Sequence, residues 1–145
     1  MLKLSKRVEY GLIAMMHMDC VRNGDLANAR EISDAYHIPA ELLGKVLQAV
    51  AKVQLIQSVQ GAHGGYRLMR PVDQITLGEV IEALEGPLQL AACQEDPSCC
   101  GQFTACNIRQ PVFEVQKRLI GYMQSLPLSA FLRDEKASES SVGVK

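Results

Sequence analysis

The chain contains no tryptophan, and its aromatic residues make up only 5% of the 145 residues. Its hydrophobic core therefore has to be built mainly from Leu, Ile, Val, Met and Ala, a composition that suits packed helices. No apolar run approaches the ~18–20 residues that cross a bilayer, so the sequence predicts no membrane-spanning helix. Hydrophobic residues nevertheless reach 48%, which excludes a wholly disordered protein.

The first ten residues lack the pattern of a secretory signal peptide. Lys3, Lys6 and Arg7 are followed by the acidic Glu9, and no small-residue cleavage site comes after it. We therefore expect a cytoplasmic protein. Because a domain usually takes ~100–200 residues, the length predicts one domain, or one domain with an appendage.

The net charge of −1 shows no excess of one sign, but the charge is unevenly distributed. Residues 1–70 carry nine basic and six acidic side chains, whereas residues 71–145 carry six and ten. A modestly basic first half favours, weakly, a polyanion-binding module.

Catalytic patterns are also missing. No paired carboxylates or nucleophile–base set stand out, and the glycines of 61–65 precede a strand rather than a helix, unlike a phosphate-binding loop. The sequence therefore predicts a protein that is not an enzyme.

The first half of the chain predicts a helix-turn-helix. Ser5 is a plausible N-cap for a helix over 6–22, and Asn28 for a short helix over 29–36. Pro39 is tolerated at the start of a third helix over 40–53. A short turn between the last two helices is typical of the motif. The positions expected to face inward are Val8, Leu12, Met15 and Met16, then Ile32 and Ala35, then Leu43, Val46, Leu47 and Val50.

A β-hairpin is predicted next, with strands over 55–59 and 66–69 around a glycine-rich loop. A hairpin directly after a helix-turn-helix is a wing. Thr76 and Glu79 then form a capping box for a helix over 77–84, which Gly86 and Pro87 end.

The last part of the chain predicts one longer helix, opened by Pro111 and ended near Ser125. Its apolar residues Val112, Val115, Leu119, Tyr122 and Leu126 are spaced alternately by three and four, as in a short coiled-coil seam. The final residues, from about Asp134, are rich in Ser, Glu and Lys and predict a disordered tail.

Four of the five cysteines, Cys93, Cys99, Cys100 and Cys106, lie within fourteen residues. In a reducing compartment such clustering indicates metal binding or redox chemistry rather than structural disulfides. The vicinal pair cannot easily bind one metal together, so three of the four form the expected ligand set. No histidine lies nearby to complete a structural zinc site, and three thiolates suit an iron–sulfur cluster. Zinc, redox-active thiols and inert thiols are the alternatives, whereas Cys20 is expected to be a small core residue.

The assembled pattern resembles the winged-helix iron–sulfur transcriptional regulators that include IscR and NsrR. The resemblance extends from about Leu2 to Leu132, and each motif alone is weak, but the four motifs in this order are a strong signal. The residues that carry it are Leu4-Ser5-Lys6, the wing sequence from Gly61 to Leu68, the stretch from Ile75 to Ile81, and the cysteine loop. It implies a mainly α fold: a winged helix-turn-helix domain (1–86), a cluster loop (87–107), a dimerisation helix (108–132) and a disordered tail (133–145).

The resemblance also implies a ligand set. The spacing of Cys100 and Cys106 is similar to that of the family, so Cys93, Cys100 and Cys106 are the expected ligands, with Cys99 as the alternative to Cys100. Members with a two-iron cluster carry a histidine where this chain has Arg109, which cannot readily bind iron. A [4Fe–4S] cluster is therefore favoured over [2Fe–2S]. NsrR-like members take a fourth ligand from the first helix of the partner subunit, and the matching residue is Glu9 of the partner subunit, although a first-turn acid is also favoured by the helix dipole.

For DNA binding, the start of the second helix of the motif is expected in the major groove. Its residues there are Pro39, Ala40, Glu41 and Leu42. Glu41 can accept a hydrogen bond from cytosine, and Ala40 or Leu42 can contact a thymine methyl group. Lys3, Lys6, Lys45 and Arg67 are assigned to phosphates. Gln60 and His63 are assigned to a wing tip in the minor groove, although His63 also suits a turn.

The predicted function is a homodimeric DNA-binding regulator, expected to be a repressor, that binds a palindromic operator. An iron–sulfur cluster would switch its operator affinity, and the controlled genes would serve cluster assembly or stress defence. A nitric-oxide-sensing repressor of the same family and a cluster-free thiol-sensing regulator are the alternatives.

Overall fold

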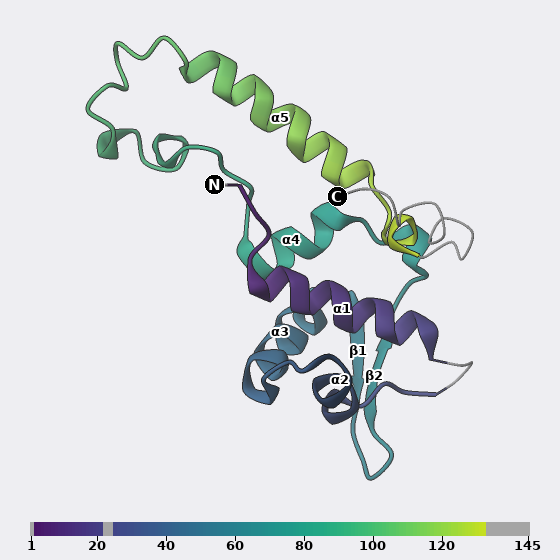
Figure 1. Cartoon of the computed structure of the whole chain (residues 1–145). Helices are drawn as coiled ribbons and strands as arrows, with labels where there is room; N and C mark the ends of the chain where they lie inside the picture. The colour runs from purple at the N-terminus through teal and green to yellow at the C-terminus, as the bar shows by residue number, and fades with distance from the viewer. Residues whose placement is uncertain (1, 22–24, 133–145) are drawn as a thin grey trace, which may run out of the picture.

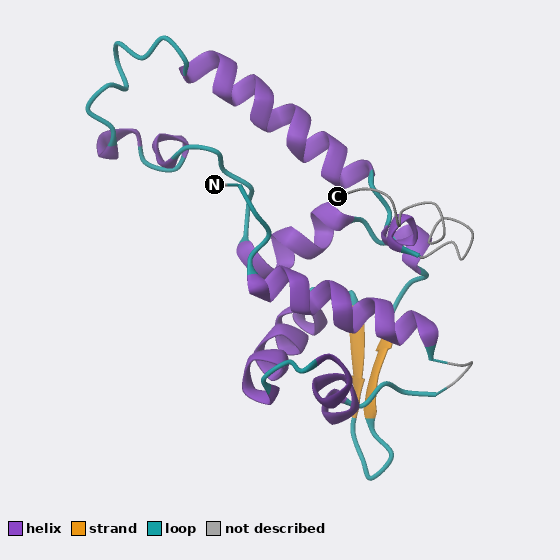
Figure 2. Cartoon of the chain, viewed as in Figure 1, coloured by secondary structure: helices purple, strands orange, loops and turns teal. Residues whose placement is uncertain are grey.

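A computed structural model describes residues 2–21 and 25–132, and its order of elements is the predicted one (Figure 1). Helices predominate, with one small hairpin, which confirms the mainly α winged fold (Figure 2). The elements are α1 (Lys6–Cys20), α2 (Ala29–Tyr36), α3 (Ala40–Lys52), β1 (Ile56–Val59), β2 (Gly65–Leu68), α4 (Leu77–Glu85) and α5 (Arg109–Ser125), with short 3₁₀ helices at 72–74, 92–94, 97–99 and 128–131. The predicted tail at 133–145 lies outside the described residues.

The predicted caps begin the helices. The Ser5 hydroxyl accepts from the Val8 N–H at 3.3 Å, and the Asn28 carboxamide oxygen accepts from the Arg30 N–H at 2.8 Å. Thr76 and Glu79 form both halves of the capping box of α4. These bonds satisfy N–H groups that no helical carbonyl can reach. α1 ends at Cys20, two residues before the predicted end, and residues 22–24 lie outside the described part.

The turn of the helix-turn-helix depends on two local features. His37 ends α2 in the left-handed region, at φ 56° and ψ 41°, which turns the chain away from the helix axis. The Ser33 hydroxyl then donates to the Ile38 carbonyl at 2.6 Å. Ile32 is the one buried residue of this short helix, so the inward position predicted for Ala35 is wrong.

The wing is a two-stranded antiparallel hairpin in which Ile56 pairs with Leu68 and Val59 with Gly65. A third backbone segment pairs with it, which the sequence analysis missed: Ala27 and Tyr66 exchange two hydrogen bonds of 2.8 and 2.9 Å. A Cβ on Gly65 would lie 2.7 Å from the Ala27 carbonyl oxygen, so this pairing requires glycine. The wing is thereby attached to the segment that precedes α2.

The core lies where α1, α3 and α4 pack together, with β1 against α3 and β2 against α1. Leu43, Val46, Leu47 and Val50 of α3 are all buried, as predicted. Gly11 lets α1 approach α4, because a Cβ there would lie 2.6 Å from Leu84 Cδ1. Cys20 is exposed at the last turn of α1, so its predicted core role is wrong. Five residues beyond Met15, it is rotated off the buried stripe of the helix.

α5 begins at Arg109, two residues before the predicted start at Pro111. Pro111 is tolerated in the first turn, because the N–H groups there have no helical partner. The helix runs beside α4 and diverges from the winged domain toward its own N-terminal end, where the cysteine loop lies (Figure 1). Its other end is attached by hydrogen bonds from Leu77 N to the Leu126 carbonyl (2.9 Å) and from Leu128 N to the Ile75 carbonyl (2.8 Å). None of the helices in 2–21 and 25–132 is long and apolar enough to cross a membrane.

Candidate DNA-binding surface and cysteine loop

The exposed face of α3 presents the predicted base-reading residues to solvent. Ala40, Glu41 and Leu42 are exposed in its first turn, after Pro39, and 46% of Leu42 is accessible although the side chain is apolar. Lys45 Nζ lies 3.6 Å from a Glu41 carboxylate oxygen, and both side chains remain well exposed. The ion pair is therefore weak enough to open when a phosphate or base competes for either partner.

Two further residues share this face. Gln48 and Lys52 are exposed and follow Glu41 at seven and eleven residues, close to two and three helical turns. A glutamine can bind adenine through two hydrogen bonds, and a lysine can bind phosphate. The sequence-based prediction did not include Gln48 and Lys52, because it covered only the start of the helix. Their helical spacing from Glu41 was the signal that could have identified them.

The wing exposes Gln60 and His63 near its tip and Arg67 along β2. The Gln60 amide donates to the Ser58 hydroxyl at 3.4 Å, and Arg67 Nε donates to Gln57 Oε1 at 2.8 Å across the hairpin. The hairpin thereby orients Arg67 while its side chain remains exposed. These three predicted contacts stay predictions, and the structure leaves all three side chains accessible to a ligand.

Two more cations lie at the start of α1, with Lys3 just before the helix and Lys6 as its first residue. Lys3 and Lys6 are exposed, and Lys6 Nζ lies 2.7 Å from a Glu9 carboxylate oxygen. The hydrogen bond to Glu9 raises the pKa of Lys6. Because this pair is exposed, both partners remain available to other ligands. Ser5 donates to Glu85, which joins the start of α1 to the end of α4.

The cysteine loop contains two short 3₁₀ helices. Cys93, Cys100 and Cys106 are half-buried, Cys99 is exposed, and all four thiols are free. Partial desolvation, followed by the charges of Asp96, Cys100 and Cys93, raises the pKa of Cys99. Asp96 caps the second 3₁₀ helix by accepting from the Ser98 N–H at 3.0 Å. Among the described residues no three Cys, His, Asp or Glu side chains are arranged to hold a metal ion.

Arg109, at the position of the missing histidine, joins the loop to α5. Its guanidinium donates to the Phe103 carbonyl at 2.8 Å and stands 4.4 Å above the Phe103 ring centroid. A cation over an aromatic face is stabilised by the ring quadrupole. A second attachment is the hydrogen bond from Leu90 N to Gln116 Oε1, at 2.9 Å. Arg109 therefore has a structural role at the position where the regulators with a two-iron cluster carry a histidine.

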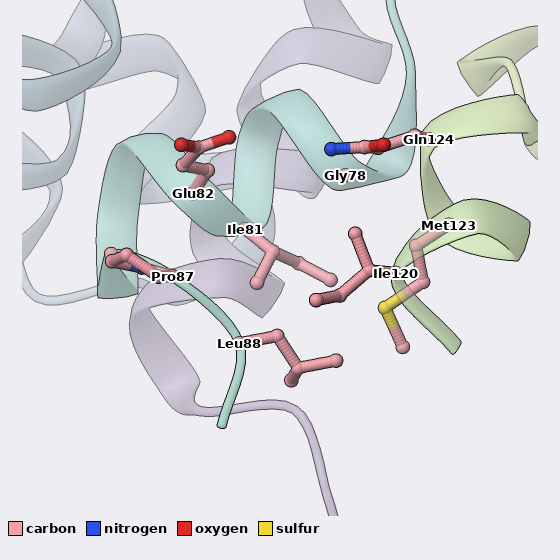
Figure 3. A pocket seen from close by; sticks show the side chains of 9 residues that line it. Gly78, Ile81, Glu82, Pro87, Leu88, Ile120, Met123 and Gln124 are labelled. Carbon is pink, nitrogen blue, oxygen red and sulfur yellow. The ribbon is translucent and has the colours of Figure 1, made fainter. Parts of the chain in front are cut away.

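An apolar groove separates α4 from α5 (Figure 3). Ile81, Leu88, Ile120 and Met123 face one another across about 170 Å³. A neighbouring groove of about 560 Å³ continues past Leu4 and Leu119 toward the chain start. The long helix therefore meets the winged domain through a partly open apolar seam rather than a closed core.

Comparison with known proteins places this architecture in a family. The model of the Rrf2 family, described as iron-dependent transcriptional regulators, matches residues 4–134. The chain belongs to the Rrf2 family. The relatives are transcriptional regulators and not enzymes, which confirms the prediction that this chain is not an enzyme.

Three relatives of this Rrf2 chain match it over at least 92% of its length. The HTH-type transcriptional regulator NsrR of Oceanobacillus iheyensis is 23% identical over 145 residues, with 99% of each chain covered. The structure of IscR from T. potens is 25% identical, with a TM-score of 0.69 over 99% of this chain and 93% of that one. CymR, the global cysteine regulator of B. subtilis, is 22% identical, with a TM-score of 0.68 over 92% of this chain and 100% of that one.

The donor chemistry of the loop fits an iron–sulfur cluster. Iron–sulfur clusters are bound by cysteine thiolates. The loop carries four free thiols, one more than a set of three cysteine ligands needs. The described loop is held mainly by local bonds and by the contacts of Leu90 and Arg109, and none of its cysteines belongs to the hydrophobic core. The fourth ligand is not supplied by Arg109, because its guanidinium carries no lone pair for iron.

Proposed function

We propose that this Rrf2 chain is a DNA-binding repressor whose operator affinity is switched by an iron–sulfur cluster in the loop 87–107. The observation that carries the proposal is the presence of four free thiols on one loop next to the long helix of a winged-helix regulator. Such a cluster, when bound, supplies a centre that reacts with oxygen or nitric oxide. Cys93, Cys100 and Cys106 are the proposed ligands of a [4Fe–4S] cluster, with Cys99 as the alternative to Cys100 and Glu9 of the partner subunit as the fourth.

The chain's own contacts provide the route from the loop to DNA. Arg109 joins the loop to the first turn of α5, and the far end of α5 is hydrogen-bonded to the start of α4. A conformational change in the loop therefore acts on the helix that is attached to the winged domain. In a homodimer that binds a palindrome, the two recognition helices must match two half-sites. These half-sites lie about 34 Å apart, one turn of DNA, or a multiple of that distance. Small rotations of α5 would then change operator affinity.

The homodimer is proposed on the exposure of the α5 seam. Val115 and Tyr122 are 51% and 63% exposed although they continue the apolar spacing that begins at Val112. Helices with such a seam are stable when a second helix covers it. A twofold pair also presents two α3 helices to one palindromic operator.

Cysteine variants test the ligand set. Cys93→Ala, Cys100→Ala and Cys106→Ala are each expected to lose most of the iron and acid-labile sulfide found in anaerobically purified parent protein. Cys20→Ala is the matched control, because this thiol is exposed on α1, outside the loop. Cys99→Ala should also retain the cluster. The reverse result for Cys99 and Cys100 would exchange their roles, and iron-free parent protein would contradict the proposal.

A cluster-free thiol sensor is the second candidate, because no three potential ligands are arranged around one point in the described structure. This function requires parent protein that is colourless and iron-free, binds its operator, and loses binding after oxidation of the loop thiols. The target genes, for cluster assembly or for stress defence, are proposed from the family resemblance. Transcript changes after deletion of the gene would show whether the controlled genes serve cluster assembly or stress defence.

A further inference from the structure

Arg70 lies at the base of the wing and forms hydrogen bonds with two partners, one just before α4 and one in its first turn. It follows β2 by two residues, and the strands extend away from it toward the wing tip (Figure 1). Its Nη1 donates to the Gln74 carbonyl at 2.8 Å, and its Nη2 donates to Glu79 Oε1 at 2.7 Å. The guanidinium thereby connects the exit of the wing with the first turn of α4.

Glu79 passes this connection on to the capping box. Its second oxygen accepts from the Thr76 N–H at 2.9 Å. Partial burial raises the pKa of this carboxyl, but the hydrogen bonds from Arg70 and Thr76 outweigh it and lower the pKa. Both side chains of the ion pair are a little over one-third exposed, so the pair is only partly screened by water.

The segment held by Arg70 and Glu79 is also the attachment point of α5. Thr76 forms an antiparallel bridge with Pro127, flanked by the two backbone bonds between 75–77 and 126–128. Ile75 and Leu128 are fully buried there. A Cβ on Gly78 would lie 2.9 Å from Gln124 Cγ and 3.0 Å from its backbone N, so α4 and α5 approach closely at this end of the groove between them. This C-terminal attachment contrasts with the N-terminal end of α5, which diverges toward the loop.

We propose that Arg70 is a positioning residue for DNA binding, which fixes the wing to the junction of α4 and α5. The inference rests on the proposed function, since it assigns Arg70 a part in operator recognition. Arg70 does not itself contact DNA: its guanidinium is engaged by two acceptors and lies at the base of the wing, whereas Gln60 and His63 lie near the tip. Without Arg70 the wing remains folded and stays attached to the segment before α2 through Ala27 and Tyr66. Its exit at 69–71 is no longer fixed to α4, so the hairpin can tilt relative to α3, which remains packed in the core.

The test separates wing contacts from α3 contacts on DNA. The operator is first obtained by selecting duplexes from a random pool with the full-length parent protein, and hydroxyl-radical footprints are then recorded. For Arg70→Met we expect protection of the flanking minor groove to disappear while protection by α3 persists, with operator affinity reduced about tenfold and binding to random duplex changed less than twofold. Glu79→Gln keeps an oxygen for Thr76 but loses the charge, and should give the same footprint. The double variant should be no worse than either single one.

Arg67→Met, in β2 and three residues before Arg70, is the matched control. Arg67 is a proposed phosphate contact, so its loss should weaken specific and random duplexes alike and lower the salt slope by about 0.9. An Arg70→Met footprint equal to that of the parent overturns the inference and leaves the proposed function intact. Simultaneous loss of wing and α3 protection also overturns it, because that result indicates general loss of fold or binding. If the parent selects no duplex, the proposed function and the inference both fall.

Discussion

The winged domain and the long helix differ in how they are stabilised. Every buried hydrophobic side chain of the described residues lies between Val8 and Leu84, except Leu128. The seventeen-residue α5 has no buried residue, although it carries an apolar seam. The first region therefore has a core of its own, whereas the second relies on its terminal attachment and, in our proposal, on a second copy of the chain.

The largest expected effect comes from a cavity in the core. Leu47→Ala, at a fully buried position of α3, should lower the free energy of unfolding by about 2–5 kcal/mol, because packing and transfer terms are both lost. The matched change in α5, Leu119→Ala, removes a half-buried side chain and should cost less when monomer unfolding is measured in urea. Equal losses would contradict the proposed difference between the regions.

The close approach of α1 and α4 provides the next comparison. Gly11→Ala places a methyl group 2.6 Å from Leu84 Cδ1, and overpacking of this kind should destabilise the fold by about 1–3 kcal/mol. Gly44→Ala meets nothing within 4 Å and should stabilise α3 by up to about 1 kcal/mol. Thermal unfolding of both variants measures whether each substitution lowers or raises the stability. A neutral Gly11→Ala would show that Leu84 can move aside and that the approach of α1 to α4 does not require glycine.

Two equally exposed valines test whether α5 is covered by a second copy. Val115 on α5 and Val53 after α3 are both 51% exposed in the single chain. Val115→Lys should raise the dimer dissociation constant at least about tenfold, equivalent to about 1.4 kcal/mol, because it introduces a charge into the proposed interface. Val53→Lys should leave it unchanged. Analytical ultracentrifugation over a range of concentrations measures the dissociation constant of each variant. A parent protein that stays monomeric at all concentrations would contradict the proposed dimer.

The smallest effect concerns acid. The pKa of Glu79 is lowered in the folded chain, so its carboxylate stabilises the fold above the ordinary value of 4.5. This contribution is lost as the pH falls below 4.5 toward the folded pKa. Glu79→Gln should therefore flatten the loss of stability between neutral and acidic pH. Asp96→Asn, in the exposed loop, should change it less, although hydrogen bonds from Ser98 also lower the pKa of Asp96. An equal change in the pH dependence of stability for both variants would contradict the expected difference between Glu79 and Asp96.

The order of elements could be predicted from the sequence because its signals are local. Ser5, Asn28 and Thr76 satisfy nearby N–H groups, and the stripe of α3 repeats within one helix. The pairing of Ala27 with Tyr66 and of 75–77 with 126–128 joins segments far apart in the chain, and no local pattern encodes such pairing. Cys20 and Ala35 were misplaced because small residues occupy buried and exposed positions alike.

The candidate site was predictable to a different degree. Residue type and spacing suffice to propose Cys93, Cys100 and Cys106 as ligands, and the structure shows that they share one loop. The role of Arg109 was not predictable, since its partner is the Phe103 carbonyl and ring, and both contacts follow from the fold of the loop. Gln48 was missed although its helical spacing from Glu41 was visible in the sequence.

The central claim is that occupancy of the loop sets the affinity of the winged domain for DNA. One anaerobic titration tests it: a selected operator is titrated with parent protein as purified, and again after its iron has been removed by chelation, while the cluster spectrum and sulfide content of each sample are recorded. We expect the two forms to differ at least about tenfold in operator affinity and little in binding to random duplex. Equal operator affinity for iron-loaded and iron-free protein would contradict it.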